Sequence, residues 1–199
     1  MTRLPPLSRT ELDAGQAQLY DALIDGPRGR AGDVPLTDDD GALRGPFAVM
    51  LVSPDVGAAV QQVGAALRYA AQLDPLTREA AVLLIAARRH SHFEWDAHVT
   101  PGHRAGLDDD QLARLHHGHV PDGLPTTTTH ALTAVAAMLD HGTLDDATFT
   151  ATRAALGPQV LAELVWLVGY YSMLALALAV YDLDGQPGPE KASHARPRR

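Results

Sequence analysis

The segment that most constrains the fold is residues 164–180, which are almost entirely apolar. At about 17 residues it reaches only the lower limit for crossing a bilayer. A Gly-Tyr-Tyr-Ser run that begins at Gly169 interrupts its middle, its start lacks basic flanking residues, and Asp182 and Asp184 follow its end. A helix that is apolar on all sides is typical of a protein core or a subunit interface. We therefore predict a buried helix here and no membrane span.

The rest of the chain carries helical periodicity. Apolar residues recur at three- and four-residue intervals, alanine and leucine are abundant, and no segment shows the alternation of a half-buried strand. Asp74-Pro75 and Asp108 are typical helix starts, and Gly157 before Pro158 is a typical helix end. We expect helices over residues 11–24, 54–71, 75–90, 92–104, 108–117, 130–140 and 145–156, followed by the long apolar helix.

These helices predict an all-α bundle that forms a single domain over residues 1–184. Residues 26–45 are rich in Gly, Pro and Asp, which indicates a long loop. The repeated order of helix pair, turn and helix pair suggests a weak internal duplication. The tail, residues 185–199, is rich in Gly, Pro and Arg and is expected to be disordered.

Charge and cysteine content exclude several function classes. The formal net charge is −8, which argues against general nucleic-acid binding because that needs a basic face. The chain has no cysteine, so it has no thiolate nucleophile, disulfide or cysteine-bound metal or cluster. The first residues lack the apolar core of a secretory signal, and a cytoplasmic location is expected.

The densest polar chemistry lies around Glu79, Glu94 and His98. Glu94 and His98 are four residues apart on one expected helix, so they share a face, and Ser91 precedes Glu94 by about one turn. A carboxylate beside an imidazole can fix its tautomer and raise its basicity, as acid–base catalysis requires. Glu79 lies in an apolar helical stretch, where it is either a first-turn acid or a group with a perturbed pKa. An ordinary surface Glu–His pair is the alternative for Glu94 and His98.

Basic residues near this group suggest two further interpretations. Arg88 and Arg89 end an expected helix, where cations are favoured, or bind a substrate carboxylate in bidentate fashion. His90, His92 and His98 could instead hold a metal ion, although no HExxH pattern is present and His90 and His92 would face different sides of a helix.

Several short strings along the chain form a recognisable set. They are Gly45-Pro46-Phe47, Ser53-Pro54, Arg78-Glu79, Phe93-Glu94-Trp95-Asp96-Ala97-His98, Ala105-Gly106-Leu107 and Gly169-Tyr170-Tyr171-Ser172-Met173. Together they resemble the carboxymuconolactone decarboxylase and alkylhydroperoxidase D-like superfamily over about residues 45–182. The resemblance implies an all-α bundle that assembles into homo-oligomers such as trimers or hexamers.

The superfamily has a peroxidase branch and a decarboxylase branch, and the resemblance implies a different chemistry for each. The peroxidase branch has a glutamate, a Cys-x-x-Cys pair and a histidine, and Glu79 and His98 match the glutamate and the histidine. The cysteine positions fall on Ser91 and Glu94, which cannot exchange thiols and disulfides, so a thiol peroxidase is rejected. The decarboxylase branch implies His98 as general acid, with Glu94 or Glu79 to orient it or relay the proton.

We therefore predict an acid–base lyase or isomerase that acts, without a metal or other cofactor, on a small carboxylated or lactone-type compound. The catalytic candidates are His98, Glu94 and Glu79. The substrate-binding candidates are Arg88, Arg89, Ser91, Trp95 and His103. A metal-dependent enzyme that uses the clustered histidines and a non-catalytic binding protein with the same fold are the alternatives.

Overall fold

The computed structural model describes residues 3–31 and 35–185, and these residues confirm the all-α fold. The helices are α1 (Ala14–Ile24), α2 (Pro27–Ala31), α3 (Pro46–Val52), α4 (Pro54–Tyr69), α5 (Pro75–Arg88), α6 (His92–Ala105), α7 (Asp109–His116), α8 (Thr126–His141) and α9 (Asp146–Tyr181), after a 3-10 turn at Arg9–Glu11. An isolated bridge between Thr37 and Leu43 is the only β-type pairing in this part of the chain.

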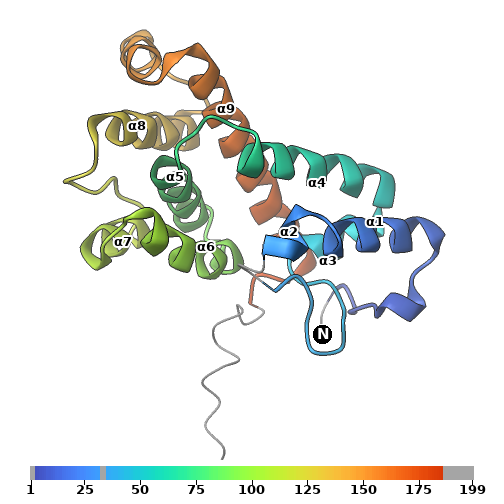
Figure 1. The fold of residues 1–199 in the computed structure, drawn as a ribbon. Helices are drawn as coiled ribbons and strands as arrows, with labels where there is room; N and C mark the ends of the chain where they lie inside the picture. Colours follow the sequence, from blue (N-terminus) through green and yellow to red (C-terminus); the bar gives the residue numbers. More distant parts are fainter. Residues whose placement is uncertain (1–2, 32–34, 186–199) are drawn as a thin grey trace, which may run out of the picture.

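Helix α5 is the centre of the bundle (Figure 1). It begins as predicted, because the Asp74 carboxylate accepts a hydrogen bond from the backbone N–H of Thr77 and Pro75 occupies the first turn. Residues 79–86 are all buried, and the helix packs against α6, α7, α8 and α9. A side chain on α5 is therefore held by neighbours on every side, which suits a residue that must keep a fixed orientation.

Helix α9 contains the apolar segment that dominates the sequence. It bends at Gly157, whose φ of 80° lies in the left-handed region, so the predicted helix end and the following Pro158 mark a kink between two helices. Among the described residues it is the one helix long and apolar enough to cross a membrane by length and composition. It packs against α5 and α8, and its buried residues join the core.

The prediction that α9 is buried on all sides is only half right for a single chain. Leu164, Leu167 and Leu178 are buried, but Trp166 and Leu176 on the opposite face are about two-thirds exposed, at 67% and 65%. The helix therefore has one face in the core of its own chain and one apolar face outward.

Three predicted boundaries need correction. Helix α2 forms inside the expected 26–45 loop, because proline is well suited to the first turn of a helix. Residues 46–52, which lie outside every expected helix, form a helix of their own, α3. Helix α8 begins at Thr126 and not at 130, because the backbone N–H of Thr129 donates to the Pro125 carbonyl at 2.9 Å. A buried bond of 2.8 Å between the Thr128 and Thr77 hydroxyls also fixes this turn. The predicted disorder of the tail falls, apart from Gly185, outside the described residues.

Candidate active site

Glu79 is a buried carboxylate on α5, with 2% of its surface exposed. Its Oε2 atom lies 2.7 Å from His98 Nδ1, and its Oε1 atom accepts a hydrogen bond of 3.1 Å from Arg78 Nε. Burial alone would raise the pKa of Glu79, but the hydrogen bond from His98 and the charges of His98, Arg78 and Arg68 outweigh it and lower the pKa. Glu79 is therefore ionised at neutral pH.

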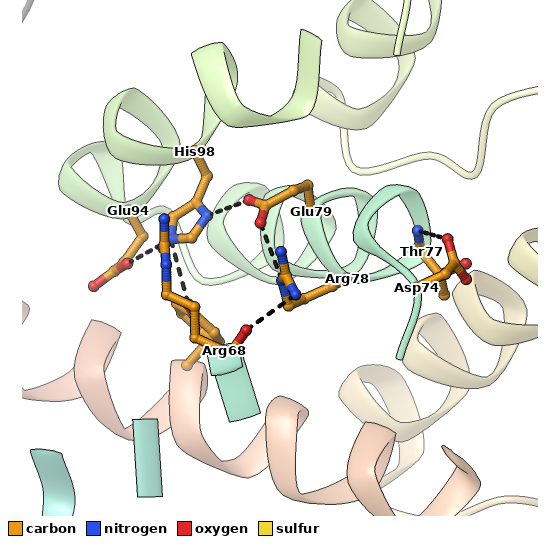
Figure 2. Close-up of polar contacts among 8 residues, drawn as sticks. Arg68, Asp74, Thr77, Arg78, Glu79, Glu94 and His98 are labelled. Carbon is orange, nitrogen blue, oxygen red and sulfur yellow. Dashed lines mark hydrogen bonds and ion pairs between the residues drawn. The ribbon is translucent and has the colours of Figure 1, made fainter. Parts of the chain in front are cut away.

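The ionised Glu79 fixes the tautomer of His98. An ionised carboxylate only accepts hydrogen bonds, so the hydrogen must be on His98 Nδ1. In the neutral ring the lone pair is then on Nε2, where the Tyr171 hydroxyl, 3.3 Å away, can donate. Burial raises the pKa of Tyr171, so the hydroxyl keeps its proton. The imidazole is thus held from both sides (Figure 2 shows the Glu79 side).

Glu94 lies on the other side of the imidazole. Its Oε2 atom is 3.7 Å from His98 Nε2, and its side chain is buried. Its Oε1 atom is also buried and has no hydrogen-bond partner among the described residues. Burial raises the pKa of Glu94, although the charges of His98 and Arg28 partly oppose the increase. An unsatisfied buried oxygen is costly, so it marks a place where a ligand or water can bind.

The two glutamates therefore have opposite properties on the two faces of one imidazole. Glu79 is ionised and orients His98, whereas Glu94 retains a proton more readily than an ordinary glutamate. A pair of carboxylates whose environments separate their pKa values in this way can divide the roles of acid and orienting base. The arrangement can move a proton between Glu94, His98 Nε2 and a bound molecule.

A small cavity lies against this group. It is lined on the polar side by Glu94, His98, Arg28, Arg68 and Tyr170, and its apolar lining includes Phe47, Phe93 and Leu174. Its volume of about 50 Å³ has room for roughly three to five water molecules. Burial raises the pKa of Tyr170 to about 12, so this hydroxyl also remains a hydrogen-bond donor at neutral pH. A cavity of mixed apolar and polar lining is typical of a small-molecule site.

The structure brings Glu79, Glu94 and His98 together but places the predicted arginines elsewhere. Arg88 donates from Nε to the Gly118 carbonyl at 2.7 Å and pairs with Asp140, so it connects α5 to the end of α7 and to α8. Arg89 is exposed and donates to Ser172 Oγ on the outside of α9. Neither lines the cavity, so position gives no support to a substrate-binding role.

The remaining predicted substrate-binding residues also lie away from the cavity. Trp95 packs edge-on against the His116 ring, with ring centroids 4.7 Å apart. It follows Glu94 directly, so the two side chains point to different sides of α6. His103 Nδ1 bonds to the Leu107 carbonyl at the end of the same helix. Ser91 is buried, but its hydroxyl is occupied by Asp184.

The histidines of the metal alternative are not brought together. His90, in the turn after α5, and His92, at the start of α6, are exposed, whereas His98 is buried against Glu79. Across the described residues no three His, Asp or Glu side chains form a group that could hold a metal ion.

Sequence reasoning missed Arg28 and Arg68 as cavity residues and gave the tyrosines of α9 no role. Arg28 falls in the segment expected to be a loop, and Arg68 is near the end of α4, so neither had a recognisable spacing to the Glu–His pair. Tyr170 and Tyr171 carried a signal, because two hydroxyl groups in the middle of an apolar helix each need a partner once buried.

Asp184 is a further residue that positions the site, because it caps α6 from the far end of the chain. Its carboxylate accepts from Ser91 Oγ and from the backbone N–H groups of His92 and Phe93, at 2.9 to 3.1 Å. These N–H groups have no partner within the helix. Glu94 sits in the same first turn.

We expect Asp184→Ala to lower the free energy of unfolding by about 1–2 kcal/mol, the range for loss of a helix cap. Asp39→Ala, which removes the same carboxylate at an exposed turn position, is the matched control. Denaturant unfolding measures both variants. Equal stability of Asp184→Ala and the wild-type protein would contradict the capping role.

Comparison with known proteins supports the fold and the segment that carries the site. Residues 54–137 match the family model of the carboxymuconolactone decarboxylase family, a segment that contains Glu79, Glu94 and His98 but not α9. No curated protein matches the chain in sequence.

Two solved structures of the debrominase Bmp8 have a similar fold. One is a cysteine-to-alanine variant in complex with 2,3,4-tribromopyrrole; it is 12% identical, with a TM-score of 0.68 over 92% of this chain and 91% of that chain. The other is the apo protein, also 12% identical, with a TM-score of 0.67 over 90% of each chain. At this identity the likeness concerns the fold alone.

Proposed function

Because this chain belongs to the carboxymuconolactone decarboxylase and alkylhydroperoxidase D-like superfamily, we propose that it is an acid–base enzyme for a small carboxylated or lactone-type compound. The observation that carries the proposal is His98 between an ionised Glu79 and a Glu94 with a raised pKa, at the wall of a cavity. Burial keeps competing water away from these groups and strengthens their interactions with a bound molecule.

In a decarboxylation, Glu94, His98 and Glu79 would each have a separate role. The bond between the substrate carbon and its carboxylate breaks, CO₂ leaves, and the electron pair stays on the carbon conjugated to a carbonyl group. Glu94 delivers a proton to that carbon, and His98 Nε2 returns a proton to Glu94 from solvent. Glu79 keeps His98 in the productive tautomer and stabilises its charged form. For an isomerisation the same pair removes a proton from one carbon and returns it to another.

The test is a screen of unsaturated γ-lactones that carry a carboxylate, run in D₂O and followed by NMR. We expect loss of the carboxylate or exchange of a carbon-bound proton for deuterium with the wild-type protein. Glu94→Gln should abolish either change, because the amide keeps the shape but cannot donate a proton to carbon. No turnover or exchange across the panel, or unchanged rates in Glu94→Gln, would contradict the proposal.

We also propose that the protein is a homo-oligomer held by the exposed face of α9, as a trimer or hexamer. Trp166, Met173, Leu176 and Val180 are exposed and recur at intervals of seven, three and four residues, so they form one stripe along the helix. An exposed apolar stripe of this kind is typical of a protein–protein contact.

Trp166→Glu is expected to shift the protein to a monomer, because it places a charge in this stripe. Thr133→Glu adds the same charge at an exposed position on α8 and should leave the assembly unchanged. Light scattering coupled to size-exclusion chromatography gives the mass of each variant. A monomeric wild-type protein, or an intact assembly in Trp166→Glu, would be the opposite result.

A further inference from the structure

Arg28 carries a buried hydrogen-bond donor that the fold does not use. Its Nε atom is buried and has no hydrogen-bond partner in the described part of the chain, while its guanidinium lies over the Phe47 ring at 5.3 Å from the centroid. Arg28 lines the same cavity as Glu94, whose Oε1 atom is also without a partner there. Two buried polar atoms without partners, on two residues that line one cavity, point to a ligand that approaches both residues.

Helix α4 makes room for this arginine. A Cβ atom added at Gly64 would collide with the Tyr170 hydroxyl and would lie 2.7 Å from Arg28 Nη2. A glycine inside a helix costs about 0.5–1 kcal/mol relative to alanine. The glycine therefore has a local role, since it lets the guanidinium and the tyrosine hydroxyl lie beside each other at the cavity.

The charges around the cavity favour an anion. Arg28 and Arg68 both line it; the charges of Arg68, Arg78 and His98 act on Glu79, whereas the charge of Arg28 acts on Glu94. Glu94 adds little negative charge while it keeps its proton. The charge of Arg28 reaches Glu94 and Tyr170, where it lowers the pKa of each group against the effect of burial.

We propose that Arg28 is the anion-binding residue of this site, and that it selects compact, flat, single-ring carboxylates whose ring lies between the aromatic side chains of the cavity. This inference rests on the proposed function for the identity of the site, but it adds the residue that binds the carboxylate and the shape of the ring that fits beside it. The guanidinium pairs with the carboxylate, Tyr170 can donate a further hydrogen bond, and the ring is directed toward Glu94 and His98. The small cavity volume favours compact acids over larger, branched ones.

The experiment measures binding of 2-furoate and of its neutral isostere 2-furamide to the full-length protein by isothermal titration calorimetry. We expect saturable binding of 2-furoate to the wild-type protein and weaker binding of 2-furamide. Arg28→Met should weaken 2-furoate binding roughly 10- to 100-fold, the value of a charge-assisted hydrogen bond. Arg30→Met, at an exposed position on the same short helix, is the matched control and should bind as the wild-type protein does.

A second variant protects the test against misfolding. Arg28→Lys keeps the charge but loses the planar fork, so it should fall between the wild-type protein and Arg28→Met. No binding of 2-furoate to the wild-type protein, equal binding of 2-furamide, or loss of binding in an Arg68→Met variant but not in Arg28→Met would each overturn the proposal.

Binding also separates this inference from the proposed function. Glu94→Gln loses turnover but should keep the preference for 2-furoate over 2-furamide, because Arg28 is unchanged and only the contact to Glu94 is altered. Failure of Arg28→Met to alter binding would remove the anion site and leave proton transfer by Glu94 and His98 standing. Loss of 2-furoate binding in Arg28→Met together with undiminished turnover in Glu94→Gln would support the anion site and remove Glu94 from the proton transfer.

Discussion

Replacement of His98 by asparagine is expected to lower turnover of a substrate found in the lactone screen by about 10²- to 10⁴-fold, the usual contribution of general acid–base catalysis. The asparagine amide can still donate a hydrogen bond toward Glu79, so the buried carboxylate keeps a partner. It has no group that can exchange a proton with Glu94. The loss should therefore appear in the turnover number more than in the binding of the substrate.

The matched control is His92→Asn, on the same helix and exposed at its first residue. It should leave turnover unchanged, because its side chain is outside the cavity. Steady-state kinetics of both variants give the comparison. A large loss in His92→Asn would favour the metal-dependent alternative, and unchanged turnover in His98→Asn would remove His98 from the chemistry.

The second large effect concerns stability, and the two glutamates should change it in opposite directions. The pKa of Glu79 is lowered by folding, so its ionised form contributes stability above its ordinary value of 4.5, and that stability is lost as pH falls below it. Glu79→Gln should therefore be less stable than the wild-type protein at pH 7 by about 1.5–3 kcal/mol, the value of a hydrogen bond to a charged group. The deficit should begin to shrink only as pH falls below 4.5 and should close as pH falls through the lowered pKa of the folded state.

For Glu94 the pH dependence of stability has the opposite sign. Its pKa is raised by burial, so the folded state is favoured while Glu94 is protonated and loses stability as pH rises above the ordinary value of 4.5. The neutral Glu94→Gln avoids that loss and should be more stable than the wild-type protein at pH 7, with the advantage vanishing toward about pH 4. Urea unfolding of the three proteins across this range measures both trends. If the free energy of unfolding changed with pH in the same direction in Glu79→Gln and Glu94→Gln, the two glutamates would not lie in opposite environments.

The fold was accessible from sequence because its signals are local. Asp74, Asp108 and Asp145 each cap the helix that was expected to follow them, and Gly157 marks the kink before the apolar segment. The missed helix α2 shows the limit, since a five-residue helix in a Gly- and Pro-rich stretch has no periodicity to detect.

The site was only partly accessible. Glu94 and His98 could be paired because four residues on one helix bring two side chains to the same face. Glu79 could be singled out as an acid in an apolar helical stretch, but its contact with His98 depends on how α5 packs against α6. Arg28 and Tyr171 reach the cavity from α2 and α9, so only tertiary packing brings them together. The arginines next to the motif, Arg88 and Arg89, were misleading because proximity in sequence places them at the far end of α5.

The most direct measurement of the central claim is an NMR titration of side-chain carboxyl carbons in protein labelled with ¹³C-glutamate, with the two signals assigned by Glu79→Gln and Glu94→Gln. We predict that the Glu94 carboxyl titrates above its ordinary value of 4.5 and that the Glu79 carboxyl titrates below it. That result would establish one proton-carrying and one orienting glutamate on the two sides of His98. Titration of Glu94 at or below 4.5 would contradict its role as the proton donor.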